Sequence, residues 1–101
     1  MNHKYLNLIG LAYRAGKCSV GEETIVKDIR SKRAKLILMA NDIGPQTKKK
    51  LIDKCHSFQV PYIIVDDRVT LSHAIGKTHH VAIAILDGGF ASKIKSLLEY
   101  E

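Results

Sequence analysis

The stretch Lys35–Pro45, which reads KLILMANDIGP, decides how the rest of the chain folds. Residues 36–40 form an uninterrupted apolar run, which is typical of a strand covered on both faces, as parallel strands of α/β proteins are. Asn41, Asp42 and Gly44 then bring the residue types of tight turns and helix starts, and we expect the two Asx side chains to bond nearby backbone. The run should be the central strand of a sheet, and it ends where open α/β sheets bind ligands.

Helices and short strands alternate on both sides of this run. Apolar residues recur every three to four positions in five segments, which predicts amphipathic helices. We expect Pro45 in the first turn of the third helix and Thr70 as the cap of the fourth. Because the connections are too long for hairpins, the pattern indicates a parallel or mostly parallel sheet between helices. The predicted helices cover about residues 3–15, 21–32, 45–58, 70–76 and 90–98, and the other strands cover 17–20, 62–65 and 81–86.

Length, charge and cysteine usage narrow the class of protein. A chain of 101 residues with 46% hydrophobic and 26% charged residues predicts one globular domain, 1–101. Its formal charge of +6 favours polyanionic partners such as nucleic acid, although many small basic proteins simply carry solvated lysines. Cys18 and Cys55 lack metal-type spacing, so we interpret them as reduced, structural thiols, Cys55 in the core and His56 in solvent. With no apolar run of ~20 residues, the sequence indicates a cytoplasmic protein without a membrane anchor.

The sequence matches the known motifs of enzyme active sites poorly. No glycine-rich phosphate loop is present, and adjacent His79 and His80 are expected to face apart as they enter a strand. Asp42, Asp66 and Asp67 could hold a metal or accept a phosphoryl group as in receiver domains, but turns also select Asp for its local hydrogen bonds. We therefore predict no catalytic residue, no cofactor and no metal.

Basic residues form the more informative pattern. Five cations fall within residues 27–35, next to a helix that opens on Gly21 and whose first N–H groups could meet a phosphate. The alternative is that these cations are the solvated face of an amphipathic helix, which is how we interpret residues 48–50. Since only 6% of residues are aromatic, no base-stacking platform is apparent, and recognition of a folded nucleic acid fits better.

Five ordered blocks of the sequence resemble the kink-turn-binding ribosomal protein family that includes archaeal L-seven-Ae, and above all its bacterial YlxQ branch. The blocks are Gly21-x-x-x-x-x-Lys27, RAKLILMAND at 33–42, Val60-Pro61-Tyr62, Leu71-x-x-Ala74-x-Gly76 and Val81-Ala82-Ile83. The resemblance implies a three-layer α-β-α sandwich around a mixed sheet of about four strands. It also implies that RNA is held by the glycine-opened helix and by the loop at residues 76–80.

The family's recognition element reads Gly, any residue, Asn, Glu and then a Lys three residues on. Glu23 stands at the Asn position of this pattern and Thr24 at its Glu position, while Gly21 and Lys27 match it. An ionised Glu23 accepts hydrogen bonds but donates none, and Thr24 is short. The resemblance therefore implies RNA binding with altered contacts to the base edges.

These observations predict a non-catalytic, monomeric protein that binds structured RNA, such as ribosomal RNA, in translation or in association with the ribosome. The cations would neutralise phosphates, the start of the helix would approach the RNA backbone, and polar side chains would contact base edges or sugars. The alternatives are a protein-interaction adaptor on the same scaffold, and a receiver-like or metal-dependent enzyme that uses Asp42 and Asp66. The residues predicted to bind RNA are Gly21, Glu22, Glu23, Thr24, Lys27, Arg30, Lys32, Arg33, Lys77, Thr78 and His79.

Overall fold

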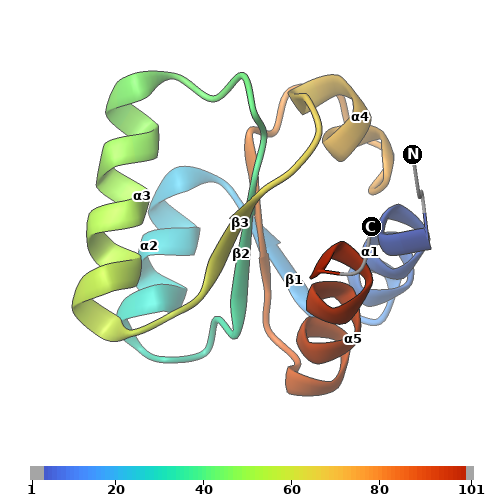
Figure 1. Cartoon of the computed structure of the whole chain (residues 1–101), viewed down its shortest axis with the longest axis horizontal. Coiled ribbons are helices and arrows are strands. Elements are labelled where there is room, and N and C mark those ends of the chain that lie inside the picture. The colour runs from blue at the N-terminus through green and yellow to red at the C-terminus, as the bar shows by residue number, and fades with distance from the viewer. Residues whose placement is uncertain (1–3, 100–101) are drawn as a thin grey trace.

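The protein is an alternating α/β chain, seen in a computed structural model that describes residues 4–99 (Figure 1). The helix start predicted at residue 3 lies outside the described residues. Within them, the elements are α1 (Lys4–Arg14), β1 (Cys18–Val20), α2 (Glu22–Arg30), β2 (Leu36–Met39), α3 (Pro45–Phe58), β3 (Tyr62–Ile64), α4 (Arg68–His73), β4 (Ala82–Ile85) and α5 (Gly88–Glu99).

The elements form three layers, as predicted. The four strands make one mixed sheet in the order β1-β4-β2-β3. Helices α2 and α3 cover one face, α1 and α5 cover the other, and the short α4 lies on the side of α1 and α5, near one end of the strands (Figure 1). The α-β-α sandwich around four strands is confirmed.

Strand β2 lies at the centre of this sheet, and all four of its residues are buried. Leu36 and Leu38 pack into the apolar cluster shared with α1, α4 and α5, whereas Ile37 and Met39 pack into the cluster shared with α2 and α3. This alternation is the two-residue period of a strand with both faces covered. The apolar run at residues 36–40 therefore separates the two hydrophobic cores, one on each face of the sheet.

The expectation of a mostly parallel sheet is wrong. Only β2 and β3 pair in parallel, while β4 is antiparallel to both β1 and β2. The reason is the connection between β3 and β4: α4 has six residues, about 9 Å of helix. A parallel connection would have to return across the length of the sheet. Instead α4 stays at the end where β3 finishes, so β4 enters from that same end (Figure 1).

Both cysteines are free, and neither is a reactive thiol by its environment. Burial raises the pKa of the Cys18 thiol to about 12 and that of Cys55 to about 11. Cys55 lies in the core and His56 is exposed, as predicted. Across residues 4–99, no helix combines the length and the apolar character that a bilayer crossing requires.

Candidate nucleic-acid interface

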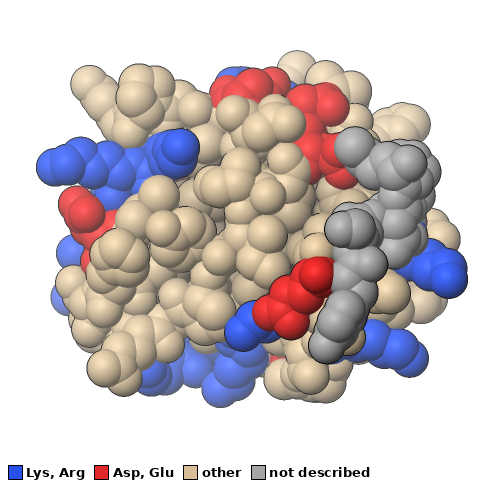
Figure 2. All heavy atoms as spheres, in the orientation of Figure 1, with Lys and Arg blue, Asp and Glu red and all other residues tan. Residues whose placement is uncertain are grey.

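Charge is unevenly spread over the surface. Figure 2 shows acidic side chains gathered at the upper border, where α4 meets the ends of β2 and β3. Basic side chains line the lower border, below α2 and α3, and also lie over the side of α3. The centre of this face, over β3, is largely uncharged. A polyanion would be attracted to the basic regions and repelled by the acidic end.

Two segments far apart in the sequence meet at one pocket. The start of α2 contributes Gly21, Glu22 and Ile25, and the loop before β4 contributes His79 and His80 to a pocket of about 220 Å³. The two histidines were expected to face apart by strand alternation, but both line this pocket, because β4 begins only at residue 82. The structure thus brings together the helix start and the loop that the sequence singled out.

The start of α2 is shaped by glycine. Gly21 has a φ of 88°, in the left-handed region that favours glycine, and a Cβ there would meet nothing within 4 Å. Conformation rather than space therefore requires glycine. Among residues 4–99, no side chain makes a capping hydrogen bond at the start of this helix. Its first N–H groups, at the positive end of the helix dipole, remain available to an anion.

Glu22 closes one wall of the pocket and ties α2 to α3. Its carboxylate accepts a hydrogen bond from Lys50 Nζ at 3.0 Å. Hydrogen bonds from Lys50 and then Thr47 lower the pKa of Glu22 below its usual range. Sequence reasoning placed Lys50 on an ordinary solvated face. The sequence did not indicate this role, because an ion pair between two helices does not alter the pattern of apolar and polar residues within either helix.

Some cations of the predicted basic cluster at residues 27–35 contact other protein groups, and others pair with none in the described part of the chain. Lys32, at a φ of 65°, donates to the carbonyl of Phe58, and Arg33 lies 3.5 Å from the carboxylate of the buried Asp28. By contrast, Lys27 and Arg30 are exposed and pair with no residue among those described. Thus Lys32 and Arg33 hold the α2–β2 turn, and Lys27 and Arg30 are free to meet a ligand.

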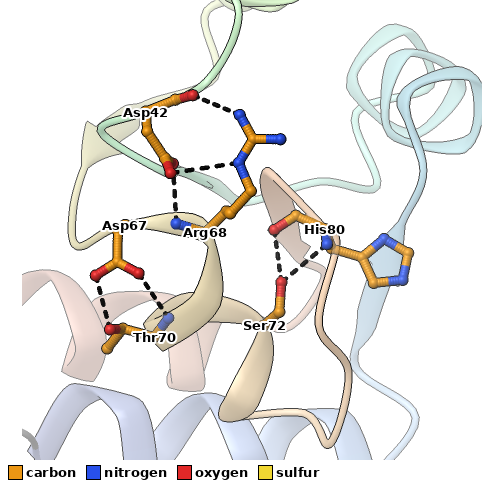
Figure 3. Close-up of polar contacts among 6 residues, drawn as sticks. All are labelled: Asp42, Asp67, Arg68, Thr70, Ser72 and His80. Carbon is orange, nitrogen blue, oxygen red and sulfur yellow. Dashed lines mark hydrogen bonds and ion pairs between the residues drawn. The ribbon is translucent and has the colours of Figure 1, made fainter.

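The loop before β4 is held at both ends by one residue of α4. The buried hydroxyl of Ser72 donates to the His80 carbonyl at 2.7 Å and accepts from the His80 N–H at 2.8 Å (Figure 3). The N–H of Lys77 also donates to the Ser72 carbonyl at 3.0 Å. The His80 imidazole points away from Ser72 (Figure 3). Residues 77–79 remain exposed on a loop whose ends are fixed.

The acidic residues considered for chemistry are engaged in structural contacts. Asp42 accepts from the Arg68 N–H at 2.9 Å and from its Nε at 3.3 Å (Figure 3). We expected Asp42 to bond its own nearby backbone, but it bonds Arg68 at the start of α4 instead. Asp66 accepts a hydrogen bond from the Tyr5 hydroxyl.

Asp67, not Thr70, caps α4. It accepts from the Thr70 N–H at 3.0 Å and from the Thr70 hydroxyl at 2.7 Å (Figure 3). These bonds lower the pKa of Asp67 below its usual range. The helix begins earlier than predicted because Asp67 takes the cap position and Thr70 becomes its partner three residues on. No group of three metal-ligating side chains is assembled in the part of the chain described.

The architecture and this surface define a small three-layer α/β protein with a pocket at the start of α2 and exposed cations in the last turn of the same helix. Residues 3–95 match the ribosomal protein L7Ae/L30e/S12e/Gadd45 family, and the chain belongs to that family. The family and relative names that follow describe ribosomal and RNA-binding proteins rather than enzymes.

Relatives at high identity span nearly the whole chain. It is 45% identical over 96 residues to the RNA-binding protein YlxQ of Bacillus subtilis (strain 168), covering 95% of this chain and 96% of that one. The RNA-binding protein YlxQ of Enterococcus faecium is also 45% identical over 96 residues, with 95% and 92% covered. A solved protein with unknown function from Bacillus halodurans C superposes with a TM-score of 0.93 at 42% identity, over 97% of this chain and 99% of that chain.

Proposed function

We propose that this protein is a single, non-catalytic domain that binds structured RNA in the bacterial cytoplasm, as a monomer, in translation or in association with the ribosome. The observation that carries the proposal is the pocket shared by Gly21 of the α2 start and by His79 of the 77–80 loop. The free cations Lys27 and Arg30 lie on the same helix. The names of the YlxQ relatives support the same function.

The mechanism is docking. Lys27, Arg30 and Lys77 neutralise phosphates, and the uncapped start of α2 meets the RNA backbone at Gly21. A pocket of about 220 Å³ is large enough to take one unpaired base, which His79 can contact at its mouth. Lys32, Arg33 and Glu22, which we predicted to touch RNA, also hold the surface in shape, and the Arg33 side chain keeps 67% of its surface exposed for contact with RNA.

Glu23 and Thr24 are both exposed on the first turn of α2, where base edges would be read. Since Glu23 offers only acceptors, we propose that it selects base edges that present donors, such as exocyclic amino groups. Recognition should therefore differ from that of family members with Asn and Glu at these positions. Replacing Glu23→Asn and Thr24→Glu together tests this, because it should raise affinity for a kink-turn RNA over a simple hairpin.

Filter binding at several salt concentrations tests the main proposal. The probes are a kink-turn RNA, a hairpin RNA and duplex DNA, and we expect a preference for RNA at every salt. Lys27→Ala with Arg30→Ala should weaken binding and flatten the slope of log affinity against log salt by about one unit for each lost phosphate contact. Lys93→Ala, an exposed lysine on α5, is the matched control and should leave the slope unchanged.

Equal binding to all three probes would contradict the proposal, as would a slope that changes no more in the double variant than in Lys93→Ala. Capture of partners from a lysate with and without ribonuclease separates this function from that of a protein adaptor. Partners that persist after complete RNA digestion would favour the adaptor.

A further inference from the structure

A second groove lies on the outer side of α2, away from the pocket described above. Its volume is about 510 Å³. It is lined by residues of α2 and by Phe58 at the end of α3, which shares the groove with Glu23, Val26, Lys27, Arg30 and Ser31.

The floor of the groove is apolar and anchored. Val26 and Phe58 are both half-buried, and both pack against the α2–α3 core while they line the groove. The ammonium of Lys32 donates to the Phe58 carbonyl and so ties the last turn of α3 to the turn that follows α2. The Phe58 ring is therefore presented from a fixed backbone, with part of its surface open to a ligand.

The rim of the groove is positively charged. Lys27 and Arg30 lie three residues apart on α2, which places them on the same side of the helix. Glu23 is four residues before Lys27, yet neither makes an ion pair within residues 4–99. Two unpaired cations and one unpaired carboxylate thus surround an aromatic ring.

We propose that this groove is a nucleotide subsite, in which an unpaired base of the bound RNA stacks on Phe58 while its flanking phosphates meet Lys27 and Arg30. An aromatic face with adjacent cations is the combination that holds single-stranded nucleotides. Glu23 can then accept a hydrogen bond from an exocyclic amino group of the base. The subsite rests on the proposed function, because it shares α2 with the RNA surface.

The ring provides the sharpest test. Phe58→Leu keeps an apolar side chain in the core but removes the stacking face, whereas Phe58→Tyr keeps that face. We expect Phe58→Leu to bind the kink-turn and hairpin RNAs roughly 5- to 100-fold more weakly, with an unchanged salt slope. Phe58→Tyr should retain wild-type affinity. The matched control is Phe90→Leu, the same substitution at a half-buried ring on α5.

Photocrosslinking gives an independent reading on the wild-type protein. RNA with 5-iodouridine at its unpaired positions should crosslink to the peptide that carries Phe58, and the crosslink should vanish in Phe58→Leu but survive in Phe90→Leu. Affinities of the two Leu variants within twofold of each other, or a wild-type protein that binds RNA without this crosslink, would overturn the subsite and leave RNA binding intact. If the wild type binds neither RNA at any salt, both proposals fail.

Discussion

Ser72→Ala is the substitution that tests most directly how the loop of the candidate interface is held. The change removes one hydroxyl from a side chain with 0% of its surface exposed. Both partners of that hydroxyl, the N–H and the carbonyl of His80, lose a hydrogen bond, at 2.8 Å and 2.7 Å. The bond from the Lys77 N–H to the Ser72 carbonyl does not depend on the side chain and should remain.

The size of the effect follows from the two groups left without a partner. A buried polar group that loses its partner costs about 1–3 kcal/mol. His80 is only half-buried, so water reaches part of it and the lower half of that range applies to each group. We expect Ser72→Ala to lower the free energy of unfolding by about 2–4 kcal/mol. Since small domains have ~5–15 kcal/mol, the variant should still fold.

Urea unfolding and hydrogen exchange measure the two consequences separately. The urea midpoint should fall at an unchanged m-value, and the His80 amide should exchange faster in the native state. RNA affinity should also fall, because the residues between the two fixed ends of the loop gain freedom. Thr70→Ala is the matched control on the same helix, since it removes a hydroxyl that bonds Asp67 and leaves the loop untouched. A Ser72→Ala protein within 0.5 kcal/mol of wild type, with unchanged His80 exchange, would refute the reasoning.

Three further predictions concern the rest of the fold. Gly10→Ala should destabilise by about 1–2 kcal/mol in urea unfolding, because its Cβ would lie 2.9 Å from the Ala74 carbonyl oxygen, whereas Gly88→Ala, in open space, should change little. The lowered pKa of Asp67 stabilises the fold above the ordinary Asp pKa, so the advantage of wild type over Asp67→Asn in urea should shrink as the pH falls below about 3.9. With its pKa raised to about 12, Cys18 should react with a thiol reagent near pH 8 at least ~100-fold more slowly in the native than in the unfolded protein.

The elements that local pattern specifies were predictable from the sequence. The apolar run at residues 36–40 predicted a strand with two buried faces, and β2 is that strand. Pro45 begins α3 because its missing N–H is not needed in a first turn. The start of α2 at Gly21 was visible for a similar reason, since a glycine before two acidic residues matches a helix start. Each of these signals is carried by neighbours in the chain.

Features that depend on long-range geometry were not predictable in the same way. The direction of β4 follows from the shortness of α4, which begins after its N-cap Asp67 and ends at its C-cap Ala74, two residues before Gly76 with its φ of 72°. The cation cluster looked uniform in the sequence, yet Lys32 and Arg33 found partners in Phe58 and Asp28. Such partners are set by how the layers pack, and composition does not encode them.

Helix α2 places its two first acidic residues in different environments, and this explains where specificity should reside. Consecutive residues of an α-helix point about 100° apart. Glu22 therefore faces the pocket, where Lys50 and Thr47 hold its charge, while Glu23 faces the outer groove and pairs with no residue in the described range. If RNA docks on α2 as proposed, it meets the free carboxylate of Glu23. Because this is the position where the family pattern has Asn, we predict that Glu23 changes which RNA is bound more than any cation on the surface does.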